Sequence, residues 1–307
     1  KFHGTFLSSI MKYQVNGRIH GEINQLRGDN GGTVSGRLSM SNPNLQQVPA
    51  RNKDFGPKIR SLFIPEEGFK WGSFDYSQQE PRMTVHYAAS IGDGYEGSNE
   101  LVEAYQNASA DFHQTVADLV GIERTQAKTI GLGLMYGMGK AKLAISLGVS
   151  KDEADELIIK YNKKVPFVKK LSDRCKYAAD EKGVIRTKKG RKCRFDMWET
   201  RDFGLHTAEK YEDAVAKYGK DNIKRAYTYK ALNRLIQGSS ADQTKQSMLD
   251  CYEAGHLPML QIHDELCFNV KDESHAKEIQ KIMQDAIEFK VPSVVDYGLG
   301  ESWGDAK

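Results

Sequence analysis

The sequence predicts an α+β protein in which one antiparallel sheet domain is interrupted by a long helical insertion. Strand-like segments occupy roughly the first 76 residues, helical patterns dominate from about 78 to 220, and strand patterns return after residue 258. The two most conspicuous acidic segments, around Asp75 and Asp264, both lie in the β-rich parts. A single sheet could therefore bring them together.

Composition indicates a folded chain without an evident membrane segment. Of 307 residues, 28% are charged and 39% hydrophobic, which is typical of globular proteins. The net charge of only +3 gives no indication of a phosphate-binding surface, so such a surface must be sought in the distribution of charge along the chain. No apolar run reaches membrane-spanning length, and the first residues lack the features of a signal peptide. Because the chain starts without Met inside structured-looking sequence, we expect a fragment or a processed chain.

The cysteines indicate a reducing compartment. They form no C-x-x-C pair and no zinc-like Cys/His cluster. We expect buried or free thiols at Cys175, Cys193, Cys251 and Cys267.

The N-terminal β-rich part predicts short strands that lead to an acidic residue. The first 35 residues are typical of a helix end followed by strands, with D-N-G-G as a turn. Residues 59–76 predict two strands joined by a Pro/Gly turn. The second strand, Trp71 to Phe74, runs directly into Asp75.

The central part predicts helices with clear boundaries. Ser150 and Glu153 form a capping box, and Pro166 ends the helix that follows. Residues 184–195 predict a hairpin with a Lys-Lys-Gly turn. A short amphipathic helix then ends at Gly219, and another helix is expected over roughly 223–253.

The C-terminal part returns to strands. Two apolar runs flank His263-Asp264-Glu265, which predicts a hairpin with the acidic pair at its tip. A helix follows, and V-V-D-Y-G-L-G-E-S-W predicts a last strand. The inward face of that helix is expected to carry Ala276, Ile279, Ile282, Met283 and Ile287.

Asp75 and Asp264 are candidate metal ligands. Magnesium prefers carboxylate oxygens, often only one or two, with phosphates and water completing its coordination. Two metals between carboxylates can activate an attacking oxygen and stabilise a leaving one. Either Asp taken alone is weak evidence, because a lone Asp at a strand end is more often a turn or cap residue.

A second constellation lies in R-T-Q-A-K-T-I-G-L-G-L-M-Y-G. Arg124, Lys128, Leu132 and Tyr136 recur every four residues and share one slowly winding helix face. Arg and Lys one turn apart can bind a polyphosphate, and Lys can protonate leaving pyrophosphate. An ordinary solvated basic face has the same spacing. The two glycines inside this helix, Gly131 and Gly133, favour close approach of some other group.

Two polar segments are candidate nucleic-acid contacts. T-V-S-G-R-L-S-M-S-N-P-N-L-Q-Q-V-P-A-R is too polar for a core segment, and Arg, Asn and Gln contact nucleic-acid bases and backbones. Asn233 and Gln237 lie one helical turn apart beside an apolar stripe. The alternatives are a plain loop for the first segment and caps or strand contacts for the second.

Taken in order, these segments resemble family A DNA polymerases over nearly the whole chain. D-Y-S-Q-Q-E-P-R resembles motif A of that family, R-T-Q-A-K-T-I-G-L-G-L-M-Y-G resembles motif B, and H-D-E at 263–265 resembles motif C. G-R-L-S-M-S-N-P-N-L-Q-Q-V-P resembles the segment before motif A that touches primer and template. The stretch K-A-L-N-R-L-I-Q is more similar to the bacteriophage members.

The resemblance implies a right-hand polymerase fold with an antiparallel palm sheet, a helical fingers insertion and a thumb remnant. It places the thumb remnant and connection at 1–35, palm at 36–85 and 226–307, and fingers at 86–225. It implies one activity, the template-directed addition of deoxynucleoside triphosphates (dNTPs) to a primer 3′-OH with release of pyrophosphate. The implied cofactor is Mg²⁺ as two ions, for which Mn²⁺ can substitute. Implied partners are primer–template DNA, the dNTP, and a processivity factor or separate exonuclease and thumb regions, with no membrane. A replicative phage-type fragment without an exonuclease domain, in bacterial or infected-host cytoplasm, is the expected source of the activity.

The resemblance also assigns roles to individual residues. Metal ligands would be Asp75 and Asp264, helped by the Tyr76 carbonyl, and Lys128 would donate a proton to pyrophosphate. Glu80, packed near Tyr136, would exclude a 2′-OH, and Glu265 would lie near the metals without being an obligatory ligand. The remaining nucleotide-binding residues would be Arg124, His113, Tyr136, Leu132 and Gln78. Primer and template would contact Arg37, Asn44, Gln46, Arg51, Asn233, Gln237 and His263.

Several positions depart from the family pattern. Leu132 stands where the family usually has Phe or Tyr, which puts selectivity toward nucleotide analogues in doubt. Gln79 and Pro81 replace common apolar residues, and Tyr229 falls where polymerase I types carry Arg. Residues 197–220 resemble a small insertion. Two alternatives stay open: a single-subunit RNA polymerase, not expected to carry Glu80 or Glu265, and a non-catalytic nucleic-acid-binding homologue.

Overall fold

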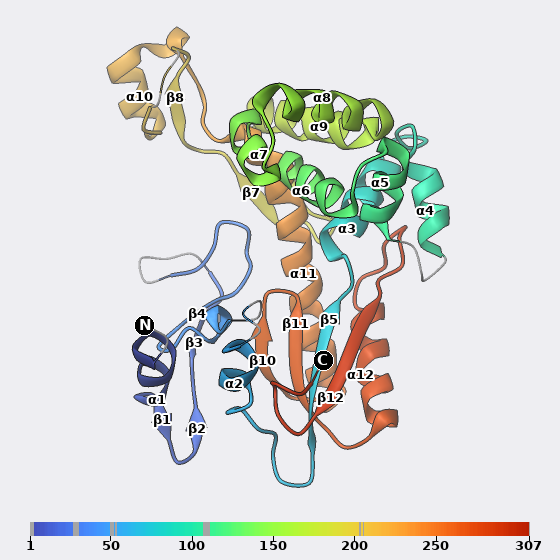
Figure 1. Ribbon diagram of the computed structural model, residues 1–307. Coiled ribbons are helices and arrows are strands. Elements are labelled where there is room, and N and C mark those ends of the chain that lie inside the picture. Colours follow the sequence, from blue (N-terminus) through green and yellow to red (C-terminus); the bar gives the residue numbers. More distant parts are fainter. Residues whose placement is uncertain are drawn as a thin grey trace. The chain divides into compact units, whose positions relative to one another are not determined.

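The computed structural model describes residues 3–26, 31–49, 52, 54–106, 111–202, 204 and 206–306. It divides into two compact units, one formed by Lys1–Gln79 with Ser240–Lys307 and the other by Glu80–Ser239, called unit 1 and unit 2 below (Figure 1). Unit 1 holds the main sheet and unit 2 is mostly helical, so the α+β prediction is confirmed. The sequence-based boundaries at 85/86 and 225/226 differ from these, and the names palm, fingers and thumb stay predictions. No helix in the described ranges is long and apolar enough to cross a membrane.

Unit 1 is built on a four-stranded antiparallel sheet in the order β10-β11-β5-β12. These strands are β10 (Pro258–Ile262), β11 (Glu265–Val270), β5 (Lys70–Tyr76) and β12 (Val295–Gly300). The predicted strand into Asp75, the predicted hairpin at 263–265 and the predicted last strand are all present. Because β5 is interior, both of its edges pair with segments that are distant in the sequence.

Alternation along β5 gives the sheet two different faces. Phe74 and Tyr76 point into a core shared with β11, α12 (Glu273–Asp285) and the C-terminal part of α11 (Ala231–Glu253). The inward helix residues Ala276, Ile279 and Met283 are buried there, as predicted, with Ile282 packed at the margin. Trp71 points to the opposite face, into a second core.

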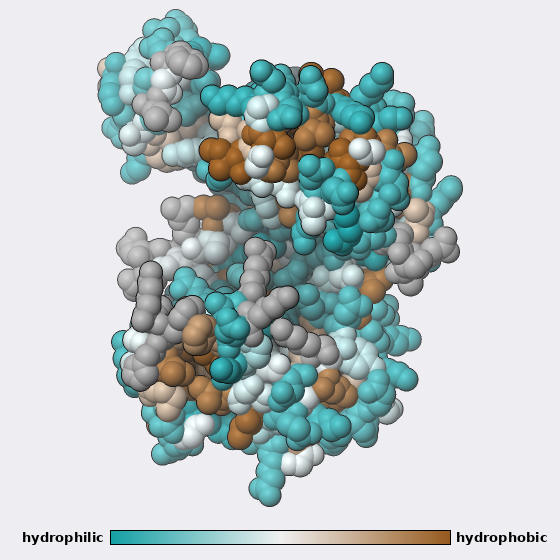
Figure 2. Space-filling view, in the orientation of Figure 1, coloured by the Kyte–Doolittle hydropathy of each residue, from teal (hydrophilic) through white to brown (hydrophobic). Residues whose placement is uncertain are grey.

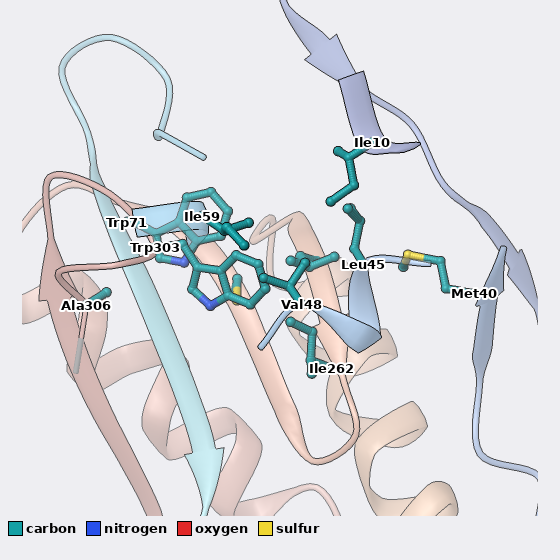
Figure 3. Close-up of a cluster of buried hydrophobic side chains, with 11 residues drawn as sticks. Ile10, Met40, Leu45, Val48, Ile59, Trp71, Ile262, Trp303 and Ala306 are labelled. Carbon is teal, nitrogen blue, oxygen red and sulfur yellow. The ribbon is translucent and has the colours of Figure 1, made fainter. Parts of the chain in front are cut away.

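The second core contains a stacked pair of tryptophans (Figure 3). The Trp71 and Trp303 rings lie 6.1 Å apart at 19°, and Phe63 meets Trp303 edge-on at 5.6 Å. The Arg60 guanidinium lies 4.3 Å from the Trp303 ring. Trp303 is only 1% exposed, so this ring joins the C-terminal segment to the sheet.

The N-terminal part of unit 1 consists of short elements. In chain order these are η1 (His3–Ser8), α1 (Ser9–Met11), β1 (Gln14–Val15), β2 (Arg18–Ile19), β3 (Glu22–Asn24), β4 (Ser39–Ser41), η2 (Leu45–Gln47) and α2 (Gly56–Arg60). The helix end and short strands were predicted, whereas Asp29 and Asn30 of the D-N-G-G turn lie outside the described residues. The strand predicted from residue 59 is wrong. Asn52 accepts hydrogen bonds from the backbone N–H groups of Asp54 and Phe55, and Pro57 fits the first turn of a helix, so α2 forms instead.

Among its described residues, unit 2 is a helical body to which two small two-stranded sheets are attached. The helices are α3 (Gln79–Ala89), which begins at the boundary of the unit, α4 (Ser98–Gln106), α5 (Phe112–Val120), α6 (Arg124–Met135), α7 (Lys140–Leu147), α8 (Lys151–Lys164), α9 (Pro166–Lys182) and α10 (Tyr211–Tyr218). The shorter elements are β6 (Val184–Arg186), β7 (Lys192–Arg194), β8 (Trp198–Thr200), η3 (Lys220–Asn222), β9 (Ile223–Arg225) and η4 (Thr228–Lys230).

Local signals explain most boundaries in unit 2. Ser150 and Glu153 exchange both capping-box hydrogen bonds, and Pro166 starts α9 directly after α8 ends. The predicted 184–195 hairpin and the helix ending at Gly219 are present. The helix predicted to start near 223 is wrong at its beginning. Ile223 is buried in β9, which pairs with β8, and Tyr227 has a positive φ that prevents helix before η4.

Trp303→Ala is expected to lower the free energy of unfolding by about 3–5 kcal/mol, because it removes a fully buried ring and leaves a cavity. Urea unfolding followed by circular dichroism would measure the change. Tyr252→Ala is the control, since that ring is 63% exposed in the same unit. Equal effects of the two changes would contradict this account of the second core.

Candidate active site

A row of carboxylates crosses the main sheet at the end of β5. Asp75 pairs directly with Glu265 of β11 on one side and with Asp296 of β12 on the other. Residues that face each other across antiparallel strands point to the same side of the sheet. The three side chains therefore share the face opposite to the Phe74 core. Asp75 remains accessible to solvent.

Asp264 joins this row from the tip of the β10–β11 hairpin. Ile262 pairs with Glu265, so His263 and Asp264 form a two-residue loop. His263 has φ 55°, in the left-handed region that non-glycine residues seldom adopt. The Tyr76 N–H donates to the Asp264 carbonyl over 3.4 Å, which ties the loop to the end of β5. The two acidic segments are thus neighbours in one unit.

A buried amide positions the same loop. The Gln261 Nε2 group donates to the His263 carbonyl over 2.6 Å, while Gln46 Nε2 donates to Gln261 Oε1 over 3.0 Å. Gln261 is buried, so its amide has a fixed place. This chain of hydrogen bonds supports the tip from the segment before α2.

Desolvation and neighbouring negative charges alter the Asp75 carboxyl. Its pKa is raised to about 7, by desolvation first and then by the charges of Asp264, Glu265 and Asp296. Glu265 is partly engaged elsewhere, because its Oε1 accepts from Trp303 Nε1 at 3.2 Å. A cation at this place would relieve the repulsion among the remaining carboxylates.

The donor set fits a hard divalent cation that also binds its substrate. Among the described residues, no three His, Cys, Asp or Glu side chains are arranged to enclose a metal. Magnesium seldom needs such an enclosure, since one or two carboxylates with phosphates and water suffice. The accessible Asp75 with the adjacent Asp264 meets that requirement.

In unit 2, the basic face of α6 is held by the start of α5. Asp111 caps α5 and accepts from Arg124 through Nε at 2.8 Å and Nη2 at 2.6 Å. These contacts lower the pKa of Asp111 against an opposing desolvation effect. His113 is buried, and its pKa falls to about 4 because of desolvation and the nearby cations of Lys128 and Arg124. It is therefore neutral at pH 7, with an Nδ1 that lacks a hydrogen-bond partner in the structure.

The end of α6 contacts the beginning of α3. The Tyr136 hydroxyl donates to Glu80 Oε2 over 2.5 Å. Inside α6, a Cβ on Gly131 would lie 3.1 Å from the Tyr161 hydroxyl, and one on Gly133 would lie 3.1 Å from Leu143 Cδ1. The close approach suggested by these glycines is therefore the packing of α8 and α7 against α6.

The comparison with known proteins decides the family. The model of "DNA polymerase family A" matches residues 1–305. The chain belongs to DNA polymerase family A.

Family A relatives include phage and bacterial enzymes. A DNA-directed DNA polymerase of Pseudomonas phage M6 is 40% identical over 351 residues, covering 99% of this chain and 49% of the relative. DNA polymerase I of Geobacillus stearothermophilus is 31% identical, covering 100% and 34%. The chain thus spans about half of the phage relative's length. A solved structure, the POL domain of Pol1 from M. smegmatis in complex with DNA primer-template and dNTP, matches with TM-score 0.77 at 28% identity, covering 98% and 50%. The right-hand fold class is confirmed, and family A polymerases use divalent metal ions.

Other predicted residues fall into distinct settings. Asn44 accepts from the Gln46 N–H over 3.1 Å and so caps η2. Gln78 has φ 52° just after β5. Asn233 and Gln237 are partly exposed on α11, and Leu132 is partly exposed on α6. Arg37 is half-buried before β4, and Arg51 lies outside the described residues. Their contacts with primer, template and nucleotide stay predictions.

Three residues of these arrangements were not singled out from the sequence. They are Asp296 beside Asp75, Gln261 behind the hairpin tip and Asp111 beside Arg124. The sequence could have identified Asp111 as a helix N-cap, because an Asp directly before an apolar helical stretch typically has that role. Asp296 stands in a strand that was predicted, but only the strand order makes it a neighbour of Asp75.

Metal-free protein is expected to lose stability as pH rises from about 4 to 7. Folding raises the pKa of Asp75 from its ordinary value of 3.8 to about 7, so the folded state holds this proton more tightly than the unfolded state does. The stability that the proton contributes is therefore complete below pH 3.8 and is lost as the pH rises to about 7. Thermal melts in EDTA would show this as a falling difference between wild type and Asp75→Asn. Parallel profiles would contradict the raised pKa, and added Mg²⁺ should reduce the loss.

Proposed function

We propose that this chain is the polymerase part of a template-directed DNA polymerase of phage type. It would add dNTPs to a primer 3′-OH and release pyrophosphate. The observation that carries the proposal is the pairing of Asp75 with the Asp264 hairpin tip on one accessible sheet face. Membership of family A supports the same reaction.

Asp75 and Asp264 are the proposed ligands of two Mg²⁺ ions, with the Tyr76 carbonyl as a further ligand and Mn²⁺ as a substitute. When bound, such ions supply activation of the attacking oxygen and stabilisation of the leaving oxygen. The protein's contribution is to hold two carboxylates on β5 and the β10–β11 loop. The Gln46–Gln261 hydrogen bond supports that loop.

Unit 2 supplies the proposed triphosphate contacts. Arg124, oriented by Asp111, and Lys128 would bind phosphate oxygens, and neutral His113 would donate one hydrogen bond. Lys128 is the proposed proton donor to pyrophosphate. Glu80, held by Tyr136, would occupy the space that a ribose 2′-OH needs. Leu132 and Gln78 complete the proposed nucleotide contacts.

Primer–template DNA is the proposed macromolecular partner. Its contacts would be Arg37, Asn44, Gln46, Arg51, Asn233, Gln237 and His263. Within this proposal unit 1 corresponds mainly to the palm and unit 2 to the fingers, and the segment before β4 corresponds to the thumb remnant. A processivity factor, or separate exonuclease and thumb regions, would act with it in the bacterial or infected-host cytoplasm.

Primer extension tests the proposal directly. Purified protein is incubated with a labelled primer–template, Mg²⁺ and dNTPs, and in parallel with ribonucleoside triphosphates. Extension with dNTPs alone is the expected result. Absence of extension would refute the reaction, while equal use of ribonucleotides would favour the RNA polymerase alternative over the role given to Glu80.

A further inference from the structure

One face of the main sheet joins the second core to the row of carboxylates. Alternation along β5 places Trp71, Ser73 and Asp75 on this face. On the neighbouring strand β11, Cys267 pairs with Ser73 and Glu265 pairs with Asp75. Glu265 therefore lies at a boundary, with the buried core further along the strands and the proposed metal ligand Asp75 directly beside it.

Two buried donors bind the same oxygen of Glu265. Its Oε1 accepts from the Trp303 Nε1–H group over 3.2 Å and from the Cys267 thiol over 3.4 Å. Although much of the unit 1 surface in Figure 2 is hydrophilic, both donors lie beneath it, with Trp303 1% exposed and Cys267 fully buried. Water has little access to either donor, so the carboxyl group is held toward the core.

The Trp303 ring is itself fixed by the second core. It stacks on Trp71 and meets Phe63 edge-on, and the Trp303 backbone N–H donates to the Phe63 carbonyl over 2.9 Å (Figure 3). The position of Nε1 is thus set by packing rather than by Glu265. A buried indole N–H usually has a hydrogen-bond partner. Here that partner is a carboxylate of the candidate active site rather than a backbone carbonyl.

The cysteine can serve as a donor because it keeps its proton. Burial, and then the charge of Glu265, raise the pKa of the Cys267 thiol well above its ordinary value. The Ser73 hydroxyl lies 3.9 Å from the sulfur and can donate to it, which leaves the S–H group for Glu265. A thiol is a weak donor, so the indole is the stronger of the two restraints on Glu265.

We propose that Trp303 and Cys267 are positioning residues that hold Glu265 back from the metal site of Asp75 and Asp264. The inference rests on the proposed polymerase function, which requires metal ions at that site. Two carboxylate ligands leave coordination positions of magnesium for phosphate oxygens and water. A released Glu265 would add a third carboxylate, which strengthens binding of a divalent cation but occupies a position that the substrate needs.

Binding of Mn²⁺ to the chain alone tests this role without any need for catalysis, and the electron paramagnetic resonance signal of free Mn²⁺ measures it. Trp303→Phe keeps an aromatic ring and removes the N–H group. Its affinity for Mn²⁺ is expected to rise by about fivefold, because affinity grows with the charge of the ligand set. Cys267→Ala should give a smaller rise. Cys267→Ser should match wild type, since a hydroxyl can replace the thiol as donor.

Two further variants separate release of Glu265 from loosened packing. Phe63→Leu removes a ring that contacts Trp303 but leaves both donors in place, so Mn²⁺ affinity should stay at the wild-type value. Glu265→Gln removes the carboxylate charge. Adding Trp303→Phe to Glu265→Gln should give no further rise in Mn²⁺ affinity, because Trp303 acts through Glu265. In primer extension, Trp303→Phe should be slower than wild type even at saturating Mg²⁺.

Thermal melts establish that each variant is folded, and Cys267→Ala decides the outcome if Trp303→Phe does not fold. Unchanged or weaker Mn²⁺ binding in the folded variant would overturn the inference. A rise for Trp303→Phe that persists beside Glu265→Gln would overturn it as well. Asp75→Asn identifies the site that is measured, because it should weaken Mn²⁺ binding. If it did not, or if wild-type protein extended no primer, the proposed function itself would fail and the inference with it.

Discussion

Asp75→Asn is expected to slow primer extension by at least about a thousandfold. Metal-assisted stabilisation of transition-state charge contributes several kcal/mol, and each 1.36 kcal/mol corresponds to a factor of ten in rate. The substitution removes one of the two proposed metal ligands while preserving the shape of the side chain. Single-turnover extension at saturating primer–template and dNTP, with Mg²⁺ varied, would separate lost chemistry from weaker metal binding. Asp264→Asn should behave in the same way.

The arrangement of the sheet supplies a matched control for this change. Asp296→Asn removes a neighbouring negative charge from the same row without removing a proposed ligand. It is expected to retain extension within about tenfold of wild type, because its effect on Asp75 is only electrostatic. If Asp296→Asn were as inactive as Asp75→Asn, the assignment of the reactive pair would be wrong.

Loss of activity in Asp75→Asn is not expected to result from misfolding. Asp75 is crowded by three other carboxylates, so its neutral analogue should stabilise the metal-free fold near pH 8 rather than weaken it. Thermal melts of the same preparations would establish this point. A variant that is inactive yet at least as stable as wild type would locate the loss in the chemistry.

The candidate metal pair could be predicted from sequence because each Asp adjoins a strong strand pattern. Trp71 to Phe74 leads into Asp75, and two apolar runs enclose Asp264. Asp296 could not be found in that way. Period-two alternation tells which residues share a face of one strand, but only strand order and register show that Asp296 faces Asp75.

The two errors in secondary structure have a common physical cause. Apolar residues near 59 and polar helix formers near 224 gave plausible local patterns, but tertiary and turn contacts decided otherwise. The Asn52 side chain and Pro57 start a helix where strand alternation was expected. The β8–β9 pairing and the positive φ of Tyr227 delay α11 until residue 231.

Lys128→Ala is expected to slow the chemical step of extension by about 10²–10⁴-fold, the usual contribution of a general acid. Arg124 on the same helix face is already paired with Asp111, whereas no carboxylate lies within ion-pair distance of Lys128 among the residues that the structure describes. Lys128 is therefore the more available of the two cations for a leaving group. Rapid-quench single-turnover measurements would give the rate of the chemical step, and dNTP titration would give the apparent affinity.

Two further variants distinguish proton donation from simple charge. Lys128→Arg keeps a cation that cannot readily release a proton. It should recover dNTP affinity more fully than the rate of chemistry. Lys140→Ala is the control, because Lys140 is an exposed lysine of the same unit paired with Asp155 at 2.5 Å. If Lys128→Arg restored the rate as completely as the affinity, Lys128 would act by charge alone, and protonation of pyrophosphate would have to come from another group or from water.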